Sequence, residues 1–177
     1  MPSGRTHDAV TILLAVPTFV AGYVYAQNPV SGGVIGAVFL FGGLMFGPDL
    51  DTVSRQYSRW SVFRFLWTPY RWCFKHRSRF SHGLIFGALL RVVYFLGILT
   101  LAAFLGALVW TSIYGGKAPT FAELAHVWQG IGEFTRANLG DNFFLFAFLG
   151  LWLGAASHTF TDVIGSYIKT GRIAKFL

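Results

Sequence analysis

The sequence predicts an all-α integral membrane protein with about four transmembrane helices and additional interfacial amphipathic helices. Three observations lead to this prediction. Hydrophobic residues make up 54% of the 177 residues, and charged residues make up only 12%, about half the charged share of an ordinary soluble domain. Mean hydropathy is +0.55. Four apolar segments approach or exceed the roughly 20 residues that a membrane-spanning helix needs.

The four predicted spans are residues 9–26, 30–46, 84–114 and 143–168, within one membrane domain that covers residues 1–177. The first two are close to the short limit, and the last two are long enough to tilt or to extend beyond the lipid. The residues Val24-Tyr25-Ala26 resemble a signal-peptidase site. Because cleavage there would remove an early histidine, we favour a retained first span over a signal peptide.

The distribution of basic residues predicts the orientation. Seven of the 14 Lys and Arg lie in the 52–82 loop, which interleaves them with Trp, Tyr and Phe. The positive-inside rule therefore places this loop and both termini in the cytoplasm. The loop is expected to form one or two interfacial helices that bind anionic lipid headgroups, which we favour over nucleic acid as the partner. On the far side, segment 115–142 contains the capping-box pair Thr120 and Glu123, which predicts a short amphipathic helix.

This topology brings seven candidate metal ligands to the cytoplasmic face. They come from four different parts of the chain: His7, Asp49, Asp51, His76, His82, His158 and Asp162. Ionisable side chains are rare beside membrane spans unless they pair or coordinate an ion. The fifth histidine, His126, is expected on the opposite side. The single Cys73 excludes an intrachain disulfide and argues against a thiolate metal site.

Each motif taken alone has a second interpretation. His158 and Asp162 are four residues apart on one helix face, which suits two ligands of one metal or a hydrogen bond that ties helices together. Asp49 and Asp51 follow Pro48 in a segment expected to be extended, where they would act as a bridging and a terminal carboxylate or simply end a helix. Histidines in a basic loop are usually solvated. It is the convergence of the motifs at one face that favours a metal site.

The sequence HRSRFSH, together with PDLD before it and a late His-xxx-Asp, resembles the membrane-bound metal-dependent hydrolases, a family that includes LexA-regulated inner-membrane proteins. The segments MPSGRTHD, GGLMFGPDLD and YSRW are similar to cyanobacterial metal-binding membrane proteins of unknown function. The resemblance covers nearly the whole chain. It implies a thylakoid or plasma membrane protein whose metal ligands are the seven residues named above.

Two functions follow from this reading. The first is a metal-dependent hydrolase of a phosphate ester or another membrane-associated substrate, with a metal-activated water helped by Asp51 and with Arg77 bound to phosphate. Imidazole and carboxylate ligands suit zinc, with iron or manganese as alternatives, and seven of them suffice for two ions. The second is a non-catalytic accessory subunit or assembly factor of a larger membrane complex, in which the metal is structural. A metal transporter is a weaker third option.

Overall fold

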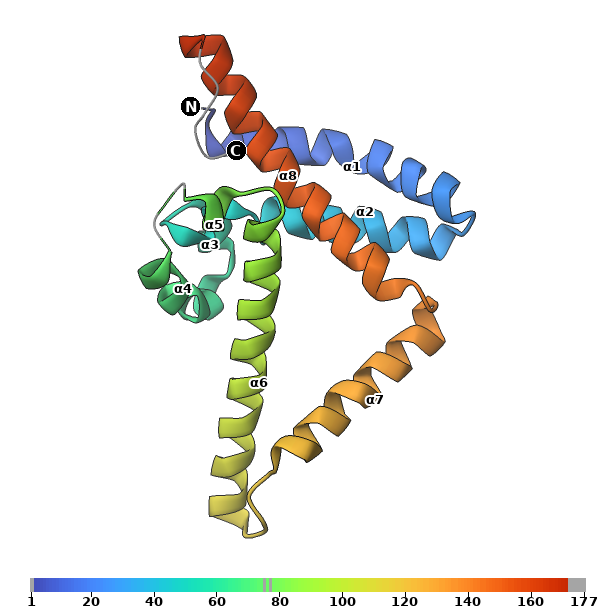
Figure 1. Ribbon diagram of the computed structural model, residues 1–177, viewed down its shortest axis with the longest axis vertical. Coiled ribbons are helices and arrows are strands. Elements are labelled where there is room, and N and C mark those ends of the chain that lie inside the picture. Colours follow the sequence, from blue (N-terminus) through green and yellow to red (C-terminus); the bar gives the residue numbers. More distant parts are fainter. Residues whose placement is uncertain (1, 75, 77, 172–177) are drawn as a thin grey trace.

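The computed structural model describes residues 2–74, 76 and 78–171, which form helices connected by short loops (Figure 1). These residues contain no strand. The long helices are α1 (Gly4–Ala26), α2 (Pro29–Leu44), α6 (Phe86–Tyr114), α7 (Phe121–Leu139) and α8 (Phe143–Thr170). The short ones are the 3₁₀ helices η1 (Pro48–Asp51) and η2 (Ser61–Trp67) and the α-helices α3 (Arg55–Arg59), α4 (Thr68–Cys73) and α5 (Arg79–His82).

Helices α1 and α2 form a hairpin, and α8 packs across both of them (Figure 1). The hairpin is tight because Asn28 caps α2 by accepting a hydrogen bond from the Val30 N–H, and Pro29 begins the helix.

Glycines allow the backbones of α2 and α8 to touch. A Cβ on Gly42 would lie 2.6 Å from the Leu151 carbonyl oxygen, and a Cβ on Gly150 would lie 2.6 Å from that of Ile35. No larger residue fits either position, so this close contact fixes how α8 lies on α2.

The short helices gather into one compact unit beside the C-terminal end of α2. Its interior is a cluster of buried aromatic and aliphatic side chains: Phe46, Leu50, Tyr57, Trp67, Tyr70 and Leu151. The Trp67 ring stacks parallel to that of Phe95 at 5.7 Å, and Tyr94 donates a hydrogen bond to the Leu66 carbonyl, so the unit is anchored to the first turns of α6. Burial raises the pKa of the Tyr70 hydroxyl, which keeps that group uncharged within the cluster.

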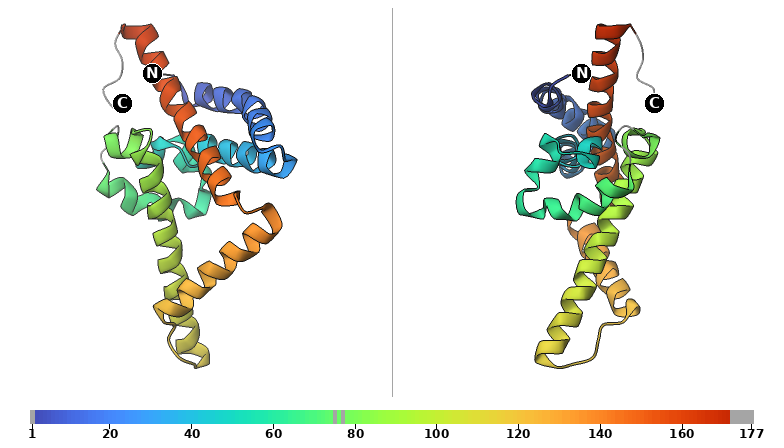
Figure 2. Two further views of the ribbon diagram at one scale, coloured as in Figure 1. Left: turned by 45° about the vertical axis from the view of Figure 1, so that its right-hand side comes forward. Right: turned by 90° about the vertical axis from the view of Figure 1, so that its left-hand side faces the viewer.

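Beyond its first turns, α6 extends away from the rest of the protein, and no residue of its most apolar stretch is classed as buried. Helix α7 returns at an angle to it and leads into α8 (Figure 2). Helices α6 and α7 are linked by a hydrogen bond from the Trp128 indole to Thr100 Oγ1 and by stacking of Phe104 on Phe121.

The predicted capping box at the start of α7 is confirmed. The Glu123 carboxylate accepts the Thr120 N–H, while Thr120 Oγ1 accepts the Glu123 N–H. The hydrogen bonds that the carboxylate accepts from the Thr120 N–H and, to a lesser extent, from the Thr120 hydroxyl hold the pKa of Glu123 below its ordinary value. The helix spans 19 residues and is therefore longer than the short helix that we expected.

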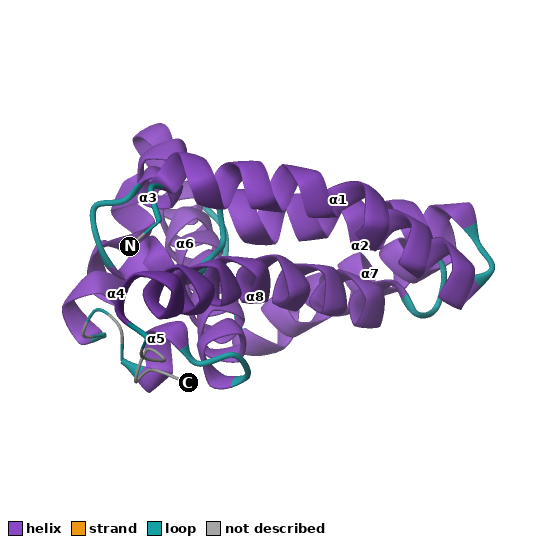
Figure 3. Ribbon diagram, turned by 90° about the horizontal axis from the view of Figure 1, so that it is seen from above, coloured by secondary structure: helices purple, strands orange, loops and turns teal. Residues whose placement is uncertain are grey.

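Four helices are long and apolar enough to cross a membrane: α1, α2 with its extension to Asp51, α6 and α8. They correspond to the predicted spans. However, α6 runs crosswise to α1 and α2 in Figure 1 and is seen nearly end-on from above in Figure 3. The structure thus shows an all-helical fold with four candidate spans, but it does not align them along one membrane normal.

The basic aromatic loop differs from expectation in its details. It forms four short helices (α3, η2, α4 and α5) where one or two were expected. Pro69 lies in the first turn of α4, where the missing N–H of a proline costs no hydrogen bond.

Candidate metal centre

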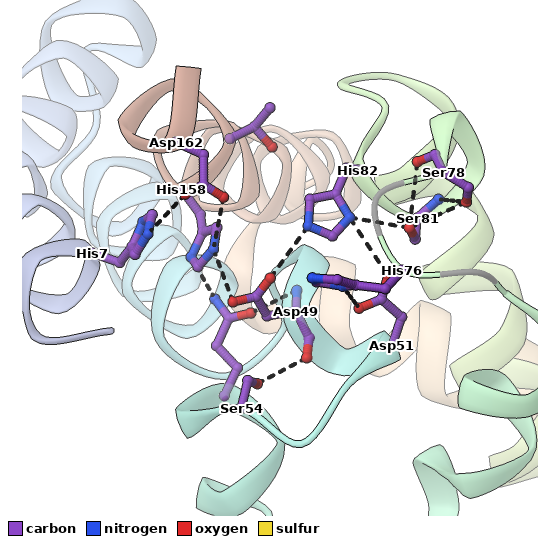
Figure 4. A network of polar contacts seen from close by, with 12 residues as sticks. His7, Asp49, Asp51, Ser54, His76, Ser78, Ser81, His82, His158 and Asp162 are labelled. Atoms are coloured by element: carbon purple, nitrogen blue, oxygen red, sulfur yellow. Dashed lines mark hydrogen bonds and ion pairs between the residues drawn. The ribbon is translucent and has the colours of Figure 1, made fainter. Parts of the chain in front are cut away.

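The seven predicted ligands lie together at the end of the α1–α2 hairpin, where α8 and the short helices meet it (Figure 4). Four segments supply them. His7 is in α1, Asp49 and Asp51 are on η1, His76 and His82 lie beside and in α5, and His158 and Asp162 are one turn apart on α8.

One group of possible ligands is fully buried. His7, His158 and Asp162 each offer an atom within 4.8 Å of the others. His7 Nε2 lies 3.3 Å from one Asp162 oxygen, and His158 Nε2 lies 3.9 Å from the other. The rings of His7 and His158 stack at 3.8 Å, so two nitrogen donors from opposite ends of the chain face the same carboxylate. We call these three residues the inner triad.

A second group is more open. Asp49, His76 and His82 likewise offer atoms within 4.8 Å of one another, and we call them the outer triad. His82 is buried, Asp49 is partly buried and His76 is exposed. Asp49 is partly buried, His76 is exposed and the other ligand candidates are buried, so the cluster meets solvent along the edge that Asp49 and His76 form.

Asp49 joins the two triads. One of its oxygens lies 3.3 Å from His82 Nε2 and the other lies 3.3 Å from His158 Nε2, as Figure 4 shows. A carboxylate placed in this way can bridge two ions. The backbone here is a 3₁₀ helix, so our expectation of an extended segment that sends Asp49 and Asp51 to opposite sides was wrong. The tight turn that starts at Pro48 instead aims both carboxylates into the cluster.

Asp51 lies behind the histidines. Its side chain is fully buried, and His76 Nδ1 donates to it at 2.8 Å while His82 Nδ1 lies 3.5 Å away. With its Nδ1 proton held by a carboxylate, His76 keeps the Nε2 lone pair for a metal, which is the usual arrangement around metal-bound histidines. The geometry therefore favours Asp51 as the group that orients these two rings, whereas the sequence suggested a direct ligand and a helper of the attacking water.

The spacing of the donor atoms fits bound cations. Three nitrogen–oxygen pairs are each separated by 3.3 Å: His7–Asp162, His158–Asp49 and His82–Asp49. Charge-assisted hydrogen bonds are usually about 2.7–2.9 Å long, whereas two ligands about 2.0–2.2 Å from one tetrahedral zinc lie roughly 3.3–3.6 Å apart. His158 Nε2, His7 Nδ1 and Asp51 Oδ2 are also buried without a hydrogen-bond partner. Such unpaired buried atoms are costly unless an ion satisfies them.

Gln56 holds three parts of the site together, although no sequence pattern pointed to it. Its Oε1 accepts from the Asp49 N–H at 3.1 Å, and its Nε2 donates to the Gly43 carbonyl at 2.7 Å. These two backbone groups fix which way the amide points. Its second N–H therefore faces His158 Nδ1 at 3.2 Å, which leaves the proton of a neutral His158 ring on Nε2. Metal binding through His158 Nε2 would require the other neutral tautomer, with the ring proton on Nδ1.

Arg91 also supports the site. It is only 2% exposed, and it donates to the Ser81 carbonyl at 2.6 Å, while Ser81 Oγ lies 3.1 Å from His82 Nδ1. The sequence did contain a signal for this residue, because Arg91 is the one charged residue in the predicted span 84–114. Such residues are functional candidates by default. Arg77, the predicted phosphate contact, lies outside the described residues.

Comparisons with known proteins agree with a metal site. The family model described as "Uncharacterized metal-binding protein (DUF2227)" matches residues 2–172. An uncharacterized protein of Aquifex aeolicus (strain VF5) is 29% identical over 135 residues, which cover 76% of this chain and 91% of that protein. The search of solved structures gave no significant match.

Proposed function

Because the chain belongs to the family of uncharacterized metal-binding proteins, DUF2227, we propose that the two triads hold divalent ions and that the outer one hydrolyses a phosphate ester at a membrane surface. The observation that carries this proposal is Asp49, which lies 3.3 Å from a histidine of each triad and reaches the open edge of the cluster. Two ions bridged by a carboxylate are a common device for phosphoryl and carbonyl hydrolysis.

The donor set supports zinc as the first choice, with iron or manganese as alternatives, since it combines imidazole with carboxylate and contains no thiolate. A bound divalent ion lowers the pKa of its water to about 7 and thereby supplies a nucleophile at neutral pH. His76 is the exposed donor of the cluster, and Asp51 holds its ring in place. Through His76, Asp51 contributes to catalysis as a positioning residue rather than by direct contact with the attacking water.

The proposal also includes the membrane. We propose that α1, α2, α6 and α8 span it, with the metal cluster and both termini on the cytoplasmic side. Large apolar side chains are exposed on the short-helix unit, among them Val62, Phe65, Trp72 and Phe80, which are 59–82% exposed. Exposed aromatics next to arginines suit the headgroup layer of an anionic membrane.

Cys73 makes the orientation testable, because it is the one cysteine in the chain and it is exposed in this unit. A membrane-impermeant maleimide should label it in inverted vesicles but not in right-side-out cells. A Cys73→Ser, Lys117→Cys variant, which moves the thiol to the α6–α7 connection, should show the reverse pattern. Labelling of Cys73 from outside intact cells would refute the orientation.

The hydrolase is tested by metal content and turnover together. Purified protein should contain zinc, iron or manganese by elemental analysis, lose it to a chelator, and hydrolyse at least one member of a phosphoester panel only when reloaded. His158→Ala should lower the metal content, whereas His126→Ala, which alters the exposed fifth histidine in α7, should not. If His158→Ala kept the metal content of the wild type, the inner triad would not be a metal-binding site.

The burial of the inner triad favours one alternative, a structural ion that links α1 to α8. Closed sites of this kind contribute to folding, while catalytic sites keep an open position. A membrane accessory subunit or assembly factor would then be the function. If the reloaded protein melts at a higher temperature than the metal-free protein but hydrolyses no phosphoester, this alternative replaces the hydrolase.

A further inference from the structure

A cluster of three charged side chains lies next to the metal centre. Asp8 of α1 contacts two arginines of α3, Arg55 and Arg59. From the sequence, Arg55 and Arg59 were expected only to contact lipid headgroups as part of the 52–82 loop, and Asp8 had no expected role. The two arginines differ in how they bind Asp8, and this difference is the basis of the inference.

Arg59 is held firmly. Its two terminal nitrogens donate to the two Asp8 oxygens at 2.9 and 2.7 Å, and one of them also donates to the Leu44 carbonyl at 2.7 Å. The side chain is 29% exposed. A bidentate pair that also satisfies a carbonyl at the end of α2 ties α1, α2 and α3 together, which is a structural role.

Arg55 is held by a single contact. Its Nη1 lies 2.8 Å from Asp8 Oδ2, the same oxygen that Arg59 Nη2 contacts, and its side chain is 52% exposed. If Arg55 turned away, Asp8 would keep both of its contacts with Arg59. The Arg55 guanidinium can therefore change partner without leaving the partly buried Asp8 carboxylate unpaired.

Arg55 also borders the metal centre directly. A cavity of about 20 Å³ is lined by Gly4, His7, Asp8, Asp49, Arg55, Gln56 and His158. This volume has room for about one water molecule. Gly4 leaves space for the Arg55 stem, since a Cβ there would lie 2.7 Å from Arg55 Cδ. Arg55 therefore forms one wall of a cavity that opens onto ligand candidates from both triads.

We propose that Arg55 binds an anionic oxygen of the substrate at the metal centre, with a phosphoryl group as the ligand class. This inference rests on the proposed function and adds a residue to it. The arriving phosphoryl group replaces Asp8 as the partner of Arg55, and the side chain turns so that the cavity widens around it. A planar guanidinium suits two phosphoryl oxygens at once.

The other arginines described near the centre either have different partners or lie away from the candidate ligands. Arg91 is buried and donates to the Ser81 carbonyl, and Arg71 lies over the Tyr57 ring at 4.7 Å. Arg64 lines a separate depression with Tyr57 and Thr68 and borders none of the candidate ligands. Arg55 thus combines an exposed guanidinium, a replaceable partner and a place beside the cluster.

The test measures binding of inorganic phosphate to zinc-loaded full-length protein in detergent, by calorimetry. Arg55→Gln should weaken phosphate binding about 10- to 100-fold, the effect of losing a charge-assisted hydrogen bond, with metal content unchanged. Arg55→Lys should recover part of the affinity. Arg59→Gln is the matched control, and it should lower the melting temperature while changing phosphate affinity less than about threefold.

Three outcomes overturn the proposal: wild-type protein that binds no phosphate, Arg55→Gln that binds it as wild type does, and a folded Arg59→Gln that loses as much affinity as Arg55→Gln. The outcome for hydrolysis is separate. If phosphate binding depends on Arg55 but no phosphoester is hydrolysed, the proposed hydrolase function is wrong and the proposed anion site is retained. If hydrolysis occurs, Arg55→Gln should also raise KM by at least the factor lost in phosphate affinity.

Discussion

The Asp51→Asn substitution tests whether the Asp51 carboxylate orients the metal-binding histidines or binds the metal itself. The substitution keeps the shape of the side chain and removes its charge. Asp51 contacts two histidines of the outer triad, His76 Nδ1 at 2.8 Å and His82 Nδ1 at 3.5 Å, and none of its surface is exposed. An asparagine there can accept a hydrogen bond from only one of the two rings, and its NH₂ group would face the other.

The expected loss follows from this geometry. Removing a group that orients one metal-bound histidine typically lowers metal affinity about 10- to 100-fold, or roughly 1.4–2.8 kcal/mol. Because Asp51 serves two rings, we expect Asp51→Asn to fall at the upper end, near 100-fold for the outer ion. The inner ion should be retained, since His7 and Asp162 do not contact Asp51.

The assay is competition with a chromophoric chelator, which gives the affinity and the number of ions. Asp49→Asn should have a larger effect and reduce both affinities, because Asp49 contacts His82 and His158. Asp141→Asn, at an exposed position between α7 and α8, is the control and should bind as wild type does. Wild-type affinity in Asp51→Asn would refute the orienting role, and complete loss of one ion would make Asp51 a direct ligand.

Three further substitutions test the framework around the site. Gly150→Ala should destabilise the protein by about 1–3 kcal/mol, the usual cost of overpacking, because its Cβ would lie 2.6 Å from the Ile35 carbonyl oxygen. The control is Gly97→Ala on α6, where nothing lies within 4 Å. Equal denaturation midpoints for the two variants would contradict the close contact between α2 and α8. Arg91→Met leaves the buried Ser81 carbonyl without its donor and should cost about 1–3 kcal/mol, seen as a lower melting temperature together with weaker metal binding. Thr120→Ala removes the capping box and should reduce the stability of α7 by about 1 kcal/mol. Backbone amides in the first turn of α7 should then exchange hydrogen faster. Unchanged exchange would show that the cap does not stabilise the helix.

Much of this fold follows from local pattern. The long apolar segments predicted the helices α1, α2, α6 and α8, and the Thr120–Glu123 spacing predicted the start of α7. The positive-inside rule also predicted that the seven ligand candidates lie together. That convergence is visible in the structure, while the binding of a metal by these residues stays a prediction.

The rest depends on contacts that no local pattern encodes. The direction of α6 is set by packing of its first turns against the short helices, through Trp67 and Phe95 among others. The 3₁₀ turn at Asp49 depends on Gln56, which lies in a different helix and accepts the Asp49 N–H. Similarly, nothing in the sequence pairs Asp8 with Arg55 and Arg59, because that pairing exists only once α3 has packed beside α1.

The order in which the triads can form during synthesis follows from where their residues lie in the chain. Asp49 and His82 are separated by 33 positions. The outer triad can therefore close while the chain is still on the ribosome, since an N-terminal unit folds as it emerges. The inner triad must wait, because His7 stacks on a histidine of α8 and shares Asp162 with it. Until α8 is made, the first helix has no partner for its histidine. In the proposed metal centre, an inner ion would therefore bind only after α8 has been made.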